Sequence, residues 1–260
     1  MRKKEQSPSF SPEEERKIAF PRKRLEGATY ELKAIATIRT DFPTKFGIPR
    51  QSGLVGGLKG RIVFEPDYRN PEALRGLEGF SHIWLLWDFS EARRAGDKWR
   101  PTVRPPRLGG NRRMGVFATR SPFRPNHIGL SSVRVLGIDL HTPEGPVIEV
   151  EGADLMDGTP IFDIKPYLPF TDSHPDATAG FTESPASCEE RAGEERHAVT
   201  FQPSILDAFD AERLGALREI LRSNPRPHYH DDPHRVYSLE FAGNEVKFRI
   251  KGDEIEAWLG

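Results

Sequence analysis

Short apolar runs separated by turn residues fill the first two thirds of the chain. Apolar and polar positions alternate from Tyr30 to Ile38, which predicts a strand with one buried face. The run from His82 to Phe89 is almost continuously apolar, and this pattern predicts a strand buried on both faces. Further strands are expected at residues 60–64, 114–119, 130–140, 146–155 and 161–167. Turn residues separate these runs at spacings typical of a β-barrel or a β-sandwich.

The last third of the chain follows a different pattern. Apolar residues recur at helical spacing over residues 204–223, which predicts a helix, and a hairpin is expected over residues 235–250 with its turn at Gly243. The sequence therefore predicts a mainly β protein in three parts. These are a flexible N-terminal extension at 1–27, a strand-rich domain at 28–181, and a polar linker (182–197) with a small α+β domain, together 182–260.

The composition is that of a protein with a buried core. With 260 residues, 36% of them hydrophobic, the chain is long enough for one large or two modest domains. The single cysteine, Cys188, excludes an internal disulfide framework and fits a reducing compartment. No apolar run approaches the roughly 18 residues of a membrane span, and the first residues lack the apolar stretch of a signal peptide. We therefore expect a cytoplasmic protein that does not enter a membrane.

Charge is segregated along the chain, although the formal net charge is only −1. Residues 98–138 contain no Asp or Glu and nine positive side chains, namely Lys98, Arg100, Arg104, Arg107, Arg112, Arg113, Arg120, Arg124 and Arg134. Residues 139–195 hold fourteen acidic side chains against two basic ones, Lys165 and Arg191. Arginine favours a phosphate-binding face, because its guanidinium binds phosphate through paired hydrogen bonds and stacks on bases. The alternative is that the acidic stretch neutralises the basic one inside the fold.

Sequence motifs of the common cofactor sites are missing. The chain has no GxGxxG, P-loop, paired CxxC or HExxH motif, so dinucleotide, nucleoside triphosphate and zinc chemistry lack their usual signatures. His228, His230 and His234 lie in a polar segment and are better explained as solvated loop residues than as metal ligands. Residues 90–111 lack apolar periodicity and contain several prolines and glycines, which predicts a long loop.

Four short segments carry candidate site residues. They are Arg50 and Gln51 in a predicted turn, His82 at the start of a buried strand, Arg120, Arg124, Asn126 and His127 at a strand-to-loop corner, and Asp154 and Asp157 around an Asp-Gly turn. An ordinary turn or a structural histidine would account for each segment taken alone.

Taken together, these segments resemble one family. The similarity to the TrmO/YaeB (TsaA-like) family of S-adenosylmethionine-dependent tRNA methyltransferases is carried by IPRQSGLV, GLEGFSHIWLLWDF, RPTVRPPRLGGNRRMGVFATRSPFRPN, IGLS, DLMDGTPIFDIKPYLPF and NPRPHY. It implies a β-barrel methyltransferase without a Rossmann fold, a smaller C-terminal domain, S-adenosylmethionine as cofactor, and a homodimer with the cofactor near the subunit interface. The implied reaction methylates the 6-amino nitrogen of threonylcarbamoyladenosine at tRNA position 37. A non-catalytic RNA-binding protein and a methyltransferase acting on a different nucleophile are the alternatives.

The resemblance also implies roles for individual residues. The implied cofactor-binding residues are Pro49, Arg50, Gln51, His82, Arg120, Leu130, Asp154, Asp157, Gly158, Thr159 and Pro160. The expected tRNA-binding residues are Arg100, Arg104, Arg107, Arg112, Arg113 and Arg124. The general base stays open among His82, Asp157 and Tyr229, and no metal is expected. Three features depart from the family's usual pattern: His127 in place of a proline, Asn224 in place of an aspartate, and the extension at 1–27.

Overall fold

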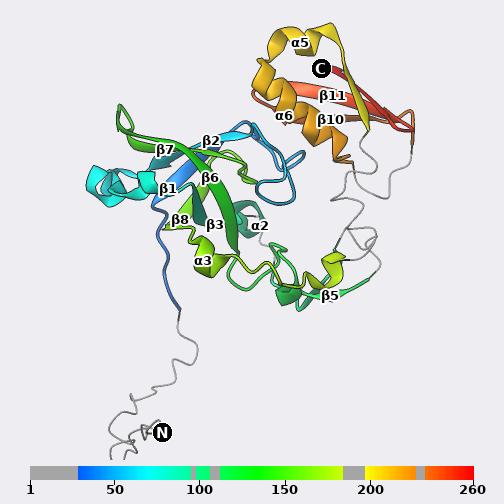
Figure 1. The fold of residues 1–260 in the computed structure, drawn as a ribbon. Helices are drawn as coiled ribbons and strands as arrows, with labels where there is room; N and C mark the ends of the chain where they lie inside the picture. Colours follow the sequence, from blue (N-terminus) through cyan, green and yellow to red (C-terminus); the bar gives the residue numbers. More distant parts are fainter. Residues whose placement is uncertain (1–28, 95–97, 106–111, 184–196, 227–231) are drawn as a thin grey trace, which may run out of the picture. The chain divides into compact units, whose positions relative to one another are not determined.

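A computed structural model describes residues 29–94, 98–105, 112–183, 197–226 and 232–260. Six strands in this part of the chain close into an antiparallel barrel in the order β1-β2-β7-β6-β3-β8, with β8 pairing back to β1 (Figure 1). The strands are β1 (Ala36–Thr40), β2 (Lys59–Phe64), β3 (His82–Asp88), β6 (Ile128–Thr142), β7 (Gly145–Glu151) and β8 (Thr159–Pro166). The predicted mainly β fold is thereby confirmed, and the barrel alternative is the one observed.

Alternation along the strands fills the barrel. On β3, Ile83, Leu85 and Trp87 are buried in the barrel core, whereas His82 is exposed and Trp84 is only partly buried. The prediction that residues 82–89 are buried on both faces is therefore wrong. Successive side chains of a strand point to opposite faces, and the outer face of β3 is only partly covered.

Two other strand predictions need correction. The strand expected from Tyr30 begins only at Ala36, where pairing with β2 and β8 starts. The run 114–119 forms the two-residue strand β5 (Met114–Gly115), followed by the 3₁₀ helix η5 (Val116–Ala118). The partner of β5 is β4 (Thr102–Val103), which is itself only two residues long and leaves later residues without a ladder to join.

Short helices lie between the barrel strands and after the last of them, β8. They are η1 (Pro66–Tyr68), η2 (Pro71–Leu74), η3 (Leu77–Gly79), α2 (Ser90–Arg94), α3 (Pro169–Asp172) and η6 (Gly180–Glu183). Helix α2 lies inside the predicted loop 90–111, of which residues 95–97 and 106–111 are outside the described residues.

The C-terminal region forms a four-stranded sheet with two helices, drawn from yellow to red in Figure 1. Its elements are β9 (Ala198–Phe201), α5 (Pro203–Ala208), α6 (Ala211–Arg222), β10 (Val236–Phe241), β11 (Asn244–Lys251) and β12 (Glu254–Leu259). The expected hairpin is confirmed as β10 and β11. The helix expected over 204–223 is instead two helices, because Phe209 is extended and the Asp210 carboxylate caps α6 by accepting a hydrogen bond from the Arg213 N–H at 2.8 Å.

The core of this sheet takes in residues from the connection between β1 and β2. Phe42, Val55 and Leu58 are buried in the same cluster as the side chains of α6 and β10 to β12. Asp41 adds polar contacts, because its carbonyl accepts from the Ala242 N–H at 2.8 Å and its carboxylate forms a salt bridge with Arg213. The predicted boundary between residues 181 and 182 stays a prediction, as does the flexibility of 1–27, which lies outside the described residues. None of the helices in the described ranges is long and apolar enough to cross a membrane.

Candidate functional site

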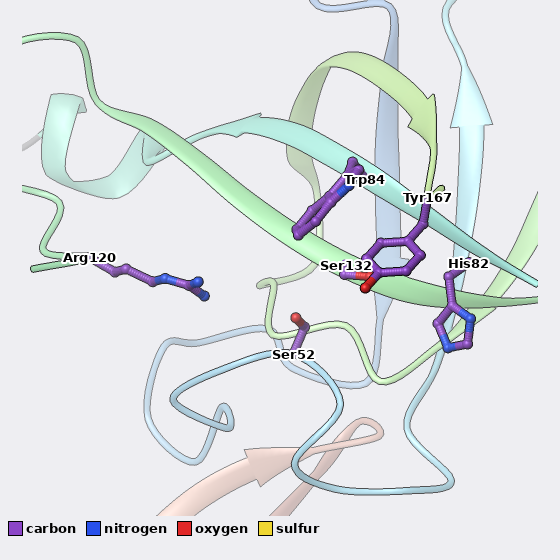
Figure 2. Close-up of a pocket in the computed structure, with 6 residues that line it drawn as sticks. All are labelled: Ser52, His82, Trp84, Arg120, Ser132 and Tyr167. Atoms are coloured by element: carbon purple, nitrogen blue, oxygen red, sulfur yellow. The ribbon is translucent and has the colours of Figure 1, made fainter. Parts of the chain in front are cut away.

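A pocket of about 450 Å³ lies against the outer face of the barrel. We call it the barrel pocket, and it is lined by Ser52, His82, Trp84, Arg120, Ser132 and Tyr167 (Figure 2). The strands supply one wall, since His82 and Trp84 come from β3, Ser132 from β6, and Tyr167 follows β8. Loops supply Ser52 and Arg120. In Figure 2 the Arg120 side chain extends toward the pocket from one end, and His82 lies at the other.

The strand wall is aromatic. The rings of Trp84 and Tyr167 lie 5.5 Å apart between centroids, and those of His82 and Tyr167 lie 6.2 Å apart. Strand alternation places these side chains outward, because Ile83 and Leu85 occupy the barrel interior. A planar heterocycle has aromatic faces to pack against at this end of the pocket.

Asp172, at the end of α3, holds Trp84 in place. Its Oδ2 accepts hydrogen bonds from the indole N–H of Trp84 and from the backbone N–H of Leu168, both at 2.9 Å. The Leu168 bond, followed by the Trp84 bond, lowers the pKa of the Asp172 carboxyl below its ordinary value. Asp172 is therefore ionised at neutral pH and fixes one edge of the aromatic wall.

Asp154 organises the other end of the barrel pocket. Its Oδ1 accepts from the Ser131 hydroxyl at 2.6 Å, and the Ser131 oxygen accepts from the indole N–H of Trp87 at 3.0 Å. Burial raises the pKa of the Asp154 carboxyl, while hydrogen bonds from Ser131 and the Ser52 backbone and the charge of Arg120 oppose that shift. The Asp154 carboxylate thus links Trp87 in the barrel interior, through Ser131, to the loops that carry Ser52 and Arg120.

A second, larger pocket of about 1320 Å³ adjoins the first. We call it the arginine trough, because its lining includes Arg50, Arg100, Arg104, Arg113 and Arg120, interleaved with Phe117, Phe123 and Phe181. None of the described residues that line it is acidic. Arg120 lines both the trough and the barrel pocket, so the two are contiguous at this side chain.

Three arginines of the trough have no ion pair with the described residues of the acidic stretch that follows them. Within the described residues, Arg100, Arg104 and Arg113 form no salt bridge, and Arg113 donates instead to the Thr102 hydroxyl at 3.2 Å. Arg134, which lines neither pocket, does pair with Glu151. Direct ion pairing therefore accounts for Arg134, whereas Arg100, Arg104 and Arg113 have no carboxylate partner among the described residues.

The structure brings together part of the predicted site. Of the predicted cofactor residues, the two pockets are lined by Arg50, Gln51, His82 and Arg120, and Arg120 donates a hydrogen bond to the Gln51 amide oxygen. Neither pocket is lined by Pro49, Leu130, Asp154, Asp157, Gly158, Thr159 or Pro160. The Asp157 carboxylate accepts from the Thr40 N–H at 3.0 Å, and the Gly158 N–H donates to the Ile38 carbonyl at 2.8 Å. The Asp-Gly turn is thus tied to β1.

Only some of the predicted tRNA-binding residues line a pocket. Arg100, Arg104 and Arg113 line the trough, Arg112 does not, and Arg107 lies outside the described residues, as does the candidate base Tyr229. The Arg124 guanidinium turns into its own loop, where it donates to the carbonyls of Val116 and Thr119.

His127, which stands where the family usually has a proline, has a φ of +28°. A proline could not adopt this value, because its ring holds φ at about −65°. Asn224, the second departure, also has a positive φ, at +49°. Asparagine adopts this left-handed conformation more readily than most side chains.

Five site residues were missed by the sequence reasoning. They are Ser52, Trp84, Ser132, Tyr167 and Asp172. Strand periodicity holds a signal for Trp84, because it lies two residues after His82 and therefore on the same face. Nothing in the sequence pattern pairs Trp84 with Asp172, which lies 88 residues away.

Comparison with known proteins identifies the family of the chain and several relatives. Residues 37–173 match the family described as tRNA-methyltransferase O N-terminal domain. The chain belongs to this family. It is 41% identical to the tRNA (adenine(37)-N6)-methyltransferase of Escherichia coli K12 over 86% of this chain and 94% of that protein. It is 39% identical to a putative S-adenosylmethionine-dependent methyltransferase, RcsF, of Pseudomonas aeruginosa, over 81% of this chain and 88% of that protein.

A solved structure supports the fold as well. The crystal structure of TrmO from Pseudomonas aeruginosa aligns with a TM-score of 0.67 at 30% identity, covering 90% of this chain and 99% of that one. The family match spans every residue that lines the barrel pocket, whereas Ala179, Phe181 and Thr182 of the trough lie beyond its end at residue 173. The barrel pocket therefore belongs to the part of the chain that the tRNA-methyltransferase O family shares.

Proposed function

We propose that the protein transfers a methyl group from S-adenosylmethionine to the 6-amino nitrogen of adenine 37 in tRNA, and that this adenosine already carries its threonylcarbamoyl group. The observation that carries the proposal is the position of Arg120, which lines both the barrel pocket and the arginine trough. A donor site that opens directly into a basic trough is what transfer to a nucleic acid requires. The names of the relatives support S-adenosylmethionine as donor and adenine 37 of tRNA as acceptor, while the threonylcarbamoyl group is what the family resemblance implies.

The barrel pocket suits S-adenosylmethionine at both ends. Its volume, about 450 Å³, lies within the range of roughly 300–1,000 Å³ of small-molecule sites. The aromatic wall of His82, Trp84 and Tyr167 would pack against the adenine, and the Arg120 guanidinium would bind the carboxylate at the opposite end. The bound cofactor would supply the methyl group. Ser52 and Ser132 add hydroxyl groups between these two ends.

The trough suits the tRNA backbone. Arg100, Arg104 and Arg113 present guanidinium groups without carboxylate partners in the described residues, and phosphate oxygens would take that place. These contacts carry no sequence information, so they would position the anticodon arm while the barrel pocket determines which atom reacts.

The transfer forms a bond between nitrogen and the methyl carbon and breaks the bond between that carbon and sulfur, and the nitrogen loses a proton. The carbonyl group on this nitrogen weakens its lone pair, so a base that removes the proton accelerates the step. Of the three candidates, His82 lines the barrel pocket, Asp157 is bonded to Thr40, and Tyr229 lies outside the described residues. Because His82 belongs to the wall assigned to the cofactor's adenine, at the end of the pocket away from Arg120, we assign no base among the three.

We also propose that the protein acts in the cytoplasm as a homodimer. The segment PYLPF supports an interface, because its Phe170 side chain is 87% exposed, an unusual position for a large apolar group. Light scattering at micromolar concentration should report twice 29.4 kDa. A stable monomer that methylates tRNA would remove the dimer from the proposal.

The function is tested with purified protein, S-adenosylmethionine and two tRNA substrates that differ only in the threonylcarbamoyl group at adenosine 37. Nucleoside mass spectrometry should find the added methyl group on the modified tRNA alone. Methylation of the unmodified tRNA would refute the substrate assignment, and methylation of neither would favour an RNA-binding protein or a different nucleophile.

The site assignment is tested with matched arginine variants. Arg120→Ala should weaken S-adenosylmethionine binding in calorimetry by roughly 10- to 150-fold, the effect of losing a hydrogen bond to a charged group. Arg134→Ala is the control, because Arg134 lines neither pocket. Arg104→Ala should leave cofactor affinity unchanged but reduce the salt dependence of tRNA binding by roughly one unit of slope. Equal cofactor affinity in Arg120→Ala and Arg134→Ala would move the cofactor elsewhere.

A further inference from the structure

Phe117 is an exposed aromatic ring in the lining of the arginine trough. It lies in η5, where its neighbour Val116 is 1% exposed while Phe117 itself is 73% exposed. Both Phe117 and the nearby Phe123 line the arginine trough. A single exposed apolar residue is common on a protein surface, but Phe117 lies with Phe123 and Phe181 in the lining of one arginine-rich pocket.

The backbone beneath Phe117 is firmly held. The Val116 carbonyl accepts hydrogen bonds from the Thr119 N–H at 3.1 Å and from the Thr119 hydroxyl at 2.8 Å. The Arg124 guanidinium donates to the carbonyls of Val116 and Thr119, at 3.3 and 2.6 Å. Val116 anchors the turn in the interior, so the exposure of Phe117 is a property of a fixed turn.

Phe123 provides a contrast within the same trough. The Arg100 guanidinium lies over its ring at 4.7 Å from the centroid, so a cation within the chain already covers one face. The Arg124 guanidinium lies over the Phe117 ring at a longer distance, 5.9 Å from the centroid, and donates to the loop carbonyls. Of these two rings, Phe117 is the less covered, with 73% of its surface exposed while Phe123 is partly buried.

We infer that Phe117 is a stacking platform for an unpaired base of the RNA that the trough binds. This inference rests on the proposed function, since it takes RNA as the occupant of the trough. Charge supports that occupant: the described lining residues include five arginines and no acid, which suits a polyanion, and a polyanion with planar rings is a nucleic acid. Stacking needs an unpaired base, because the faces of paired bases are covered by their neighbours.

Base stacking on Phe117 can be distinguished from electrostatic binding by the salt dependence of RNA affinity. Binding of a fluorescent anticodon stem-loop RNA is measured by anisotropy at several salt concentrations for wild type, Phe117→Ala and Phe117→Tyr. Phe117→Ala should weaken binding by about 5- to 150-fold, the range for loss of one base stack, with an unchanged salt slope. Phe117→Tyr keeps the ring and should bind like wild type. Arg104→Ala is the opposite control, because it should change the slope.

Three results would overturn the inference. They are wild-type affinity in Phe117→Ala, an equal loss of affinity for a fully paired RNA duplex, and a change of mass in light scattering, which would place the ring in a protein contact. Calorimetry with S-adenosylmethionine should show no effect of the substitution, since Phe117 does not line the barrel pocket. Failure of the wild-type protein to bind the stem-loop is a separate outcome that refutes the proposed function together with the inference.

Discussion

Gly129 lies on β6 at the point where the strand passes the Trp87 ring. A Cβ added there would lie 2.2 Å from Trp87 Cε2 and 2.5 Å from Cδ2, so Gly129→Ala cannot be accommodated without moving the indole. That ring has little freedom. It is 8% exposed, donates to the Ser131 hydroxyl at 3.0 Å, and packs against Phe89 at 4.3 Å between centroids.

The expected destabilisation follows from these contacts. Forcing extra volume into a packed interior costs about 1–3 kcal/mol, and loss of the indole hydrogen bond adds about 0.5–1.5 kcal/mol. We expect Gly129→Ala to lower the free energy of unfolding by about 2–4 kcal/mol, which lowers Tm by roughly 5–15 °C in a protein of this size. Displacement of Trp87 also disturbs Ser131 and through it Asp154, so cofactor binding should weaken in the protein that remains folded.

Gly137 is the matched control on the same strand, because a Cβ added there meets nothing within 4 Å. Gly137→Ala should leave Tm within a few degrees of wild type or raise it slightly, by restricting the unfolded chain. Scanning calorimetry of both variants decides. If Gly129→Ala melts within a degree of Gly137→Ala, the reasoning from the Trp87 contact is refuted.

Three aspartates give further expectations. Because burial raises the pKa of Asp154, wild-type stability should fall as pH rises from 3.8 through the raised pKa, and Asp154→Asn should lack this trend in denaturant titrations; a parallel trend in both proteins would contradict it. Hydrogen bonds lower the pKa of Asp172, so its hydrogen bond from Trp84 should persist above that lowered pKa and be lost as the pH falls through it. Tryptophan fluorescence should report this loss in the wild type and show no such change in Asp172→Asn. Asp157→Ala should lower the free energy of unfolding by about 1–3 kcal/mol, because the Thr40 N–H loses its acceptor; unchanged S-adenosylmethionine affinity in this variant would remove Asp157 from the proposed cofactor site.

The sequence by itself determined the local elements and the family. Short apolar runs between turn residues located the barrel strands, the turn at Gly243 located the hairpin of β10 and β11, and the motifs from IPRQ to DIKPYLPF identified the family. These features are encoded within a few consecutive residues, through side-chain alternation and turn chemistry, so they are readable without knowledge of the fold.

Only the tertiary structure decided which of these residues meet. Pairing of β3 with β6 and β8 brings Trp84, Ser132 and Tyr167 together, and two loops far apart in sequence add Ser52 and Arg120. The bond from Trp84 to Asp172 and the exposure of Phe117 depend on the same long-range packing. The local pattern at 114–119 favoured a strand, but β4 offers a ladder of only two residues, so the chain turns into η5 instead. A local preference for strand or helix is worth roughly a few tenths of a kcal/mol per residue, and contacts between distant segments outweigh it. These contacts cannot be read from any short stretch of consecutive residues.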